Sequence, residues 1–242
     1  MLLVVLALLL PVQSVAEADS LFALGNQLYA EGDFRGAVAA YEGAAETGWT
    51  SPALELNLGA AYVEAGQLGR AVLHFERAHR LAPRDPDIEH NLRLARARVD
   101  VSPSPLAPTD AVARWLSEHV GAHGLALGLF VLYLAVLGLV AVRAWTKTPR
   151  PWLRRALLVL VPLGLLVTVA AVGTARYATQ PRAVVVAGEA VVRASPSPTA
   201  GTTATLPEGA VVPVMDARGG WHAVRLPDGG EGWVAAPMLE EV

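Results

Sequence analysis

The sequence contains no cysteine, which excludes disulfide bonds, thiol catalysis and zinc sites built on thiolates. Charged residues make up only 17% of the 242 residues, and Lys147 is the only lysine. No dense Lys/Arg patch interleaved with aromatic residues occurs, so we expect no nucleic-acid partner. Hydrophobic residues, by contrast, account for 53% of the chain, which indicates membrane-embedded sequence.

Residues that could carry out catalysis or bind a metal are equally sparse. The sequence has no nucleophile elbow, no phosphate-binding glycine loop and no paired carboxylates in an apolar setting. His119 and His123 are the only histidines with the i, i+4 spacing of metal ligands, but a zinc site needs further ligands and a second shell. We therefore expect no enzyme activity, no cofactor and no metal site.

The first 16 residues have the features of a secretion signal. Leu2 to Leu10 form an apolar core, Pro11 is expected to break it, and Ser14 to Ala16 supply the small residues that a signal peptidase recognises. No Lys or Arg precedes the apolar core, so an uncleaved anchor or a different start remains an alternative.

Two long apolar runs predict a transmembrane hairpin. Residues 120–142 and 156–175 carry no charge, and each run is long enough as a helix to cross a hydrocarbon core of about 30 Å. The connecting residues 143–155 contain five basic residues and no acid, which predicts a cytoplasmic loop. Both flanking soluble segments should then face the extracytoplasmic side.

Aromatic residues flank both spans, as expected of interfacial belts: Trp145 and Trp152 on the loop side, Trp115 and Tyr177 on the outer side.

Small residues and a proline inside the spans admit two interpretations. Gly124 and Gly128 form a small-xxx-small pair, and Pro162 could kink the second span. Close packing of the hairpin explains both features better than a transport path, because neither span contains an Asp, Glu, Lys or Arg side chain.

The segment before the spans repeats itself with a period of 34 residues. Seven pairs of positions match: Leu24/Leu58, Gly25/Gly59, Gly32/Gly66, Ala37/Ala71, Val38/Val72, Tyr41/Phe75 and Ala44/Ala78. Small residues would let two antiparallel helices approach closely, Leu24 and Tyr41 would fill the space between them, and Gly32 or Gly66 would turn the chain. The pattern resembles the tetratricopeptide repeat; the alternative is a generic amphipathic helical bundle.

A further helix is expected after the second repeat. Asp85 and Pro86 provide an N-cap and a first helical residue, and the helix should run to about Val99 and cap the stack. The repeats and this helix define a domain over residues 17–100. Residues 101–119 follow as a Pro-rich linker and an interfacial segment.

Residues 182–242 change to short β-branched runs separated by turn residues, which predicts a small, strongly bent β-barrel of five strands. The stretches AVVRASPSPTAGTTATLPEGAVVPV, GGWHAVRL and GGEGWVAAPML resemble the bacterial SH3 family. Trp221 and Trp233 are the candidate ligand surface of this module, because exposed indoles can dock Pro-rich or sugar ligands. Packing into the barrel core is the alternative role.

The order of these segments resembles the BatE-like tetratricopeptide-repeat proteins of the Bat aerotolerance family. The stretch LNLGAAYVEAGQLGRAVLHFERAHRLAPRDPDIEHNL carries most of this likeness. The resemblance implies a scaffold in the bacterial inner membrane. Its partners would be membrane-anchored proteins with von Willebrand A domains, linked to a MoxR-type ATPase in envelope stress or aerotolerance. The rival hypothesis is a cell-wall adaptor that binds peptidoglycan through the SH3-like domain, and a transporter subunit is a third.

Asparagines within the predicted helices indicate a peptide-binding groove. Asn is unfavourable in a helix, and by resemblance to the repeat family such positions line the concave face. The candidate groove residues are Phe22, Asn26, Tyr29, Asn57 and Asn91. Their amides could bond to the main chain of an extended peptide. Phe22 stands where carboxylate-binding members have a lysine, and Asp87 where a base would be needed, so we expect an internal segment of a partner and not a free C-terminus. The alternative is that the amides bond only to water or to neighbouring helices.

The fold class expected from the sequence is therefore a multidomain membrane protein. It combines all-α repeats, a two-helix hairpin and a small all-β barrel.

Overall fold

We describe a computed structural model of the chain, which covers residues 2–99, 112, 115–116, 119–146, 151–186, 188–226 and 228–242. Side chains are described throughout these ranges except for residues 2–14, 121–123 and 177–178. The chain forms two compact units. The first contains residues 1–104 and 181–242, and the second contains residues 105–180. The expected Pro-rich linker at 101–110 lies outside the described residues.

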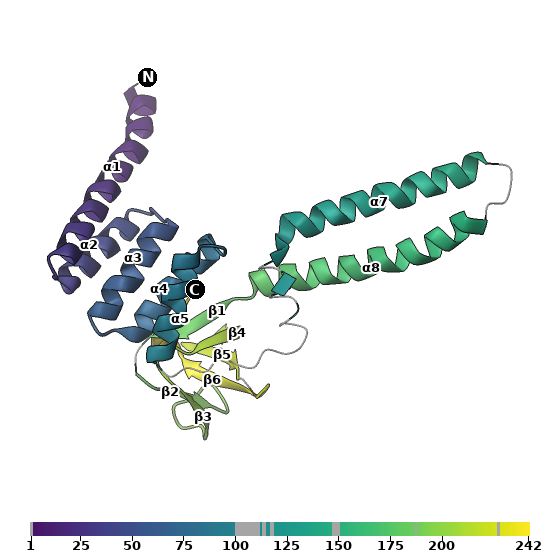
Figure 1. Cartoon of the computed structure of the whole chain (residues 1–242). Coiled ribbons are helices and arrows are strands. Elements are labelled where there is room, and N and C mark those ends of the chain that lie inside the picture. Colours follow the sequence, from purple (N-terminus) through teal and green to yellow (C-terminus); the bar gives the residue numbers. More distant parts are fainter. Residues whose placement is uncertain are drawn as a thin grey trace. The chain divides into compact units, whose positions relative to one another are not determined.

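The first unit begins with five α-helices: α1 (Leu2–Ala30), α2 (Phe34–Glu46), α3 (Pro52–Glu64), α4 (Leu68–Leu81) and α5 (Pro86–Arg98) (Figure 1). Side-chain oxygens cap three of them, because Asp33, Ser51 and Asp85 accept hydrogen bonds from the otherwise unpaired amides of the following turn. Helix α1 runs through Pro11, and a helix can absorb the lost backbone bond at a proline as a kink.

Two helix pairs repeat the same internal contact with an offset of 34 residues. Gly25 of α1 lies against the Tyr41 ring of α2, and Gly59 of α3 lies against the Phe75 ring of α4; a Cβ at either glycine would come within 2.4 Å or 2.5 Å of the ring. Gly32 and Gly66 connect the helices of each pair at φ +82° and +78°, which glycine adopts without strain. The two pairs are therefore built alike.

One expectation for this packing is wrong. Leu58 is buried, but its equivalent Leu24 is 44% exposed and does not fill space between helices. Leu58 packs in the core that α2, α3 and α4 share, whereas no described helix precedes α1 to cover Leu24.

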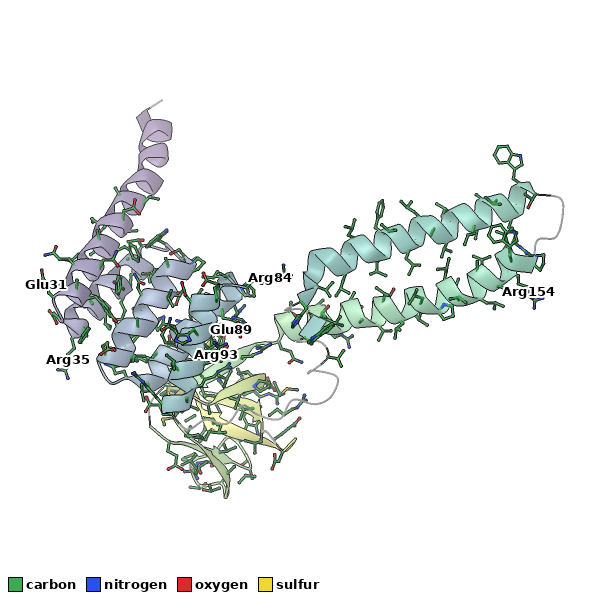
Figure 2. All side chains as sticks on the ribbon, viewed as in Figure 1. Glu31, Arg35, Arg84, Glu89, Arg93 and Arg154 are labelled. Atoms are coloured by element: carbon green, nitrogen blue, oxygen red, sulfur yellow. The ribbon has the colours of Figure 1, made fainter. Side chains whose placement is uncertain are left out.

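The second unit contains two long apolar helices, α7 (Gly121–Trp145) and α8 (Pro151–Thr179), which pack against each other. Gly124–Trp145 and Pro151–Arg176 are long and apolar enough to cross a membrane. Both helices extend into the expected loop 143–155, since Arg143 belongs to the last turn of α7 and Arg154 to the first turns of α8 (Figure 2). Lys147 and Arg150 lie outside the described residues, as does the Tyr177 side chain.

The glycines expected to bring the hairpin together do not do so. No described side chain of α8 lies within 4 Å of a Cβ placed on Gly124 or Gly128. Gly164 of α8 makes the close approach instead, since its Cβ would lie 3.5 Å from Leu132 Cδ2 of α7. Helix α8 continues through Pro162.

The described residues after 180 form seven strands and one 3₁₀ turn. The strands are β1 (Arg182–Val185), β2 (Ala190–Arg193), β3 (Thr202–Leu206), β4 (Val211–Arg218), β5 (Trp221–Arg225), β6 (Glu231–Ala235) and β7 (Leu239–Glu241), with η1 (Ala236–Met238) before β7. All pairings are antiparallel, and the sheet order is β3-β2-β6-β5-β4-β1-β7.

The expectation of five strands is therefore wrong, since β3 and β7 were missed. Every strand contributes to one buried cluster, which shows that the sheet curves around its own core. This core consists mostly of small and β-branched residues: Ala183, Val185, Ala190, Val192, Leu206, Ala210, Val212, Val214, Val224, Leu226, Val234 and Leu239.

Candidate functional site

The structure brings together two of the predicted groove asparagines. Asn26 of α1 and Asn57 of α3 are 31 residues apart, yet Asn57 Nδ2 donates to Asn26 Oδ1 at 2.9 Å. The Tyr41 hydroxyl of α2 donates to the same oxygen at 2.8 Å. Two donors on Asn26 Oδ1 fix the orientation of that amide, so its Nδ2 group and the Oδ1 atom of Asn57 remain for other partners.

Tyr41 remains a donor over the whole physiological range. Its side chain is 1% exposed, and burial raises its pKa above the ordinary value of 10.0. The phenol therefore stays protonated and holds Asn26 Oδ1 as an acceptor. We call Asn26, Asn57 and Tyr41 the amide pair and its anchor.

Tyr41 was not among the residues predicted for this site, although the repeat contains a signal for it. The second repeat has Phe75 at the position equivalent to Tyr41 and Ala60 at the position equivalent to Asn26. The hydroxyl and the amide that it bonds are thus present together in the first repeat and absent together in the second.

Two predicted groove residues are aromatic and pack against their neighbours. The Phe22 ring lies 5.7 Å from the Tyr41 ring and 5.2 Å from the Trp49 ring, centroid to centroid. Tyr29 makes an edge-to-face contact with Phe34 at 5.3 Å. Both side chains are partly exposed and pack against the edge of the helical core.

The third asparagine is placed differently. Asn91 Nδ2 donates to the Asp87 carbonyl oxygen at 2.8 Å, one turn earlier in α5. This bond within its own helix uses one hydrogen of the amide, and no described bond joins Asn91 to Asn26 or Asn57. On the exposed surface of α5, Arg93 pairs with Glu89 at 2.9 Å (Figure 2).

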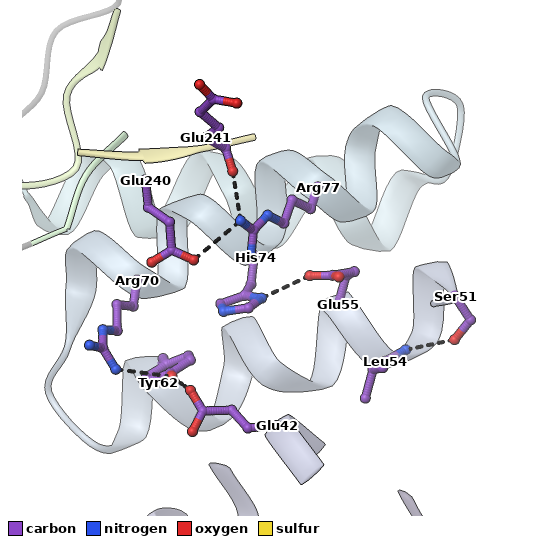
Figure 3. Close-up of polar contacts among 10 residues, drawn as sticks. All are labelled: Glu42, Ser51, Leu54, Glu55, Tyr62, Arg70, His74, Arg77, Glu240 and Glu241. Carbon is purple, nitrogen blue, oxygen red and sulfur yellow. Dashed lines mark hydrogen bonds and ion pairs between the residues drawn. The ribbon is translucent and has the colours of Figure 1, made fainter. Parts of the chain in front are cut away.

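A partly buried polar network links α2, α3 and α4 (Figure 3). The Tyr62 hydroxyl donates to Glu42, and Arg70 Nη1 donates to the same hydroxyl at 3.3 Å. His74 stacks on the Tyr62 ring and bonds Glu55 Oε2 at 2.8 Å. Burial, followed by the bond to Glu42, raises the pKa of Tyr62 to about 12. Each polar group has a partner, so the network fixes the helices.

Trp221 and Trp233 lie on one face of the β5–β6 hairpin. Trp221 pairs with Ala235, and Trp233 pairs with Ala223, so the two indoles are diagonal neighbours on the same side of the sheet. The residues between them along each strand, His222 and Val234, point to the other side. Neither tryptophan belongs to the barrel core, and both are partly exposed.

One arginine lies beside each of the two indoles on this face. Arg193 pairs with Trp233 across β2 and β6, and Arg218 pairs with Trp221 across β4 and β5. Arg193 is held in place because its Nη1 donates to the Ala200 carbonyl oxygen at 2.8 Å. We call Trp221, Trp233 and these two arginines the tryptophan face.

No group of three or more Asp, Glu or His side chains in the described part of the chain is arranged to hold a metal ion. His119 stacks on Trp115 at 4.9 Å, and its Nδ1 lies 3.0 Å from the Trp115 carbonyl oxygen. The side chain of His123 and all of Glu118 lie outside the described residues.

Comparison with known proteins identifies one part of the chain. No curated protein matches the chain. Residues 188–240 match the family model of the bacterial SH3 domain, a range that begins just before β2 and ends within β7 and so leaves out β1.

Proposed function

We propose that this chain is a membrane-anchored scaffold and not an enzyme, in which the helical domain binds a partner protein through the amide pair. The observation that carries the proposal is the meeting of Asn26 and Asn57 from separate repeats. Their free donor and acceptor complement the C=O and N–H groups of one extended peptide segment.

We assign the helical units to the tetratricopeptide-repeat class. The support is the 34-residue offset of the Gly25–Tyr41 and Gly59–Phe75 contacts together with the equivalent turns at Gly32 and Gly66. In a stack of such units, α1 and α3 line the inner surface, which is where Asn26 and Asn57 occur. Repeats of this kind stack into surfaces for protein binding.

By resemblance to the Bat aerotolerance family, the partners we propose are membrane-anchored proteins with von Willebrand A domains, in a complex for envelope stress or aerotolerance. The expected location is the bacterial inner membrane, with residues 1–16 as signal peptide and both soluble segments on the extracytoplasmic side. The two apolar helices and the basic residues between them support this arrangement.

The test is partner capture by the full chain, purified in detergent from membranes that contain the proposed von Willebrand A proteins. The variant Asn26→Ala/Asn57→Ala removes two hydrogen-bonding amides, and it should lose about 1–3 kcal/mol of binding, or roughly five- to 150-fold in affinity. Gln27→Ala is the matched control, because Gln27 follows Asn26 in α1 but bonds to Glu31 of its own helix. Equal capture by both variants would rule out the amide pair.

A second candidate function is cell-wall attachment through the tryptophan face. It is favoured by the bacterial SH3 match and by the exposure of two indoles on one side of the sheet. If the domain binds peptidoglycan, the full chain should sediment with purified sacculi, and Trp221→Ala/Trp233→Ala should not. Val191→Ala is a matched control on exposed β2 surface. Sedimentation that is unchanged by the tryptophan variant would exclude this face.

A further inference from the structure

Strand β1 belongs to two hydrophobic cores at once. Ala183 and Val185 point into the barrel core, whereas Val184, between them, is fully buried among residues of the helical repeats. Alternate side chains of a strand point to opposite faces, so β1 forms the boundary between the barrel and the helices. The strand precedes the segment that matches the bacterial SH3 model.

Backbone atoms also approach closely across this boundary. Gly69 N at the start of α4 donates to Glu208 Oε1 at 2.7 Å, and a Cβ on Gly69 would lie 2.7 Å from the Val185 carbonyl oxygen. On the barrel side, a Cβ on Gly209 would lie 2.9 Å from Val99 Cγ2 and 3.4 Å from Val72 Cγ2. A glycine on each side is what allows this contact.

Two arginines extend the same contact along α4 to the last strand. Arg77 Nη2 donates to Glu240 Oε1 at 3.2 Å and to the Glu241 carbonyl oxygen at 2.6 Å (Figure 3). Arg80, one turn further, donates to the Val242 carbonyl oxygen. Gly69 and Val72 are three residues apart in α4, as are Arg77 and Arg80, so one side of this helix carries the whole set.

We infer that this face of α4, with the end of α5 at Val99, is a docking surface whose occupant is the barrel of the same chain. The helices and the barrel then form one folded unit, into which the membrane hairpin is inserted. Direct contact between the helices and the barrel is impossible across a bilayer. Both soluble segments therefore lie on the same side of the membrane. The docked face is unavailable to other proteins, while the amide pair and the tryptophan face remain accessible.

Because the chain has no cysteine, any disulfide must form between introduced cysteines. In Val99→Cys/Gly209→Cys, one cysteine precedes the hairpin and the other follows it, and the Cβ positions are 3.5 Å apart, within the range that a disulfide requires. A protease site introduced into the 101–111 segment allows the fragments to be separated. The inference predicts that most of the cleaved full-length protein stays joined on non-reducing electrophoresis after mild oxidation in its membrane.

The matched control is Val99→Cys/Gly229→Cys. Gly229, like Gly209, has a positive φ, of +86°, but it lies in the β5–β6 turn, with no described neighbour within 4 Å of its Cβ. This pair should remain unjoined. Equal joining of the two pairs, or joining of neither, would overturn the inference.

A second pair guards against misfolding of the glycine variant. Arg77→Cys/Glu240→Cys replaces two partly exposed side chains that touch each other. A short bismaleimide should join this pair in the intact membrane protein, and should not join Arg77→Cys/Glu231→Cys, since β6 is separated from β7 by three strands in the sheet order. If the bismaleimide fails to join Arg77→Cys/Glu240→Cys, the inference is also overturned.

Discussion

The contact between Gly59 and the Phe75 ring allows the packing of the repeat to be tested by adding one methyl group. In Gly59→Ala the new Cβ would lie 2.5 Å from Phe75 Cε1 and 2.6 Å from Cδ1, where carbon atoms prefer about 3.5–4.0 Å. The ring is 1% exposed and has little room to move. Overpacking of this kind costs about 1–3 kcal/mol.

Alanine also favours a helix over glycine by about 1 kcal/mol, which opposes the steric cost. Gly43→Ala separates the two effects, because Gly43 lies inside α2 and its Cβ would meet Leu21 Cδ1 at an ordinary 3.5 Å. Gly43→Ala should therefore stabilise by about 1 kcal/mol. The difference between the two variants is the overpacking cost alone, about 1–3 kcal/mol.

The assay is thermal unfolding of the full chain in detergent, followed by tryptophan fluorescence, since Trp49 packs in the helical domain. At about 2–4 °C per kcal/mol for a unit of this size, Gly59→Ala should unfold about 2–12 °C below Gly43→Ala. Phe75→Leu, added to each alanine variant, should relieve the clash with Ala at position 59 and so reduce the difference between the two unfolding midpoints. Equal midpoints for the two alanine variants would refute the close approach of α3 and α4.

Val184→Thr buries a hydroxyl in the helical core and should cost about 1–3 kcal/mol in the free energy of unfolding, measured by denaturant titration, whereas Val191→Thr at a 38% exposed position should cost little. Burial raises the pKa of Tyr62 to about 12, so the folded chain keeps the phenol proton at a pH where the unfolded chain has released it. The free energy of unfolding that this difference contributes should be fully present below pH 10 and should fall as the pH rises toward 12. Tyr62→Phe should weaken this alkaline loss in the same titration. Alkaline phosphatase fused after Asp110 or Val242 should be active and a fusion at Thr148 inactive, and the reverse pattern would contradict the proposed topology.

Local sequence signals predicted most of the helical structure. Gly32, Gly66 and the Asp85–Pro86 pair define where helices start and turn, because caps and positive-φ glycines act over a few residues. Exposure was harder to predict. Leu24 and Leu58 occupy equivalent positions, but only Leu58 is covered by a preceding helix pair.

The missed strands lack the pattern that identifies a strand in a sequence. β3 reads TTATL and buries only Leu206, while β7 has three residues and follows a 3₁₀ turn. Their pairing partners supply the hydrogen bonds: β7 pairs with β1, which is distant in sequence, and β3 pairs with β2, the strand directly before it. In contrast, the unbroken apolar run from Ala183 to Val186 is typical of a strand that is buried on both faces, and it could have predicted the docking of β1.

The candidate site was only partly predictable for the same reason. Asn26 and Asn57 were chosen because asparagine is unfavourable in a helix, but their direct bond depends on how α1 packs beside α3. Asn91 gave the same sequence signal although its amide bonds within α5. Propensity therefore marks unusual residues without specifying which of them meet.

We expect a partner protein to occupy the surface around the amide pair. A photoreactive amino acid at Ala60 tests it most directly, because Ala60 is partly exposed on α3 one turn after Asn57 and is equivalent to Asn26 in the repeat. Ala39, exposed on α2, is the control position. Illumination of cells that carry the full chain should yield a defined adduct from position 60 that is lost with Asn57→Ala, and none from position 39. The same adduct from both positions, or one that Asn57→Ala leaves unchanged, would show that the amide pair does not bind the partner.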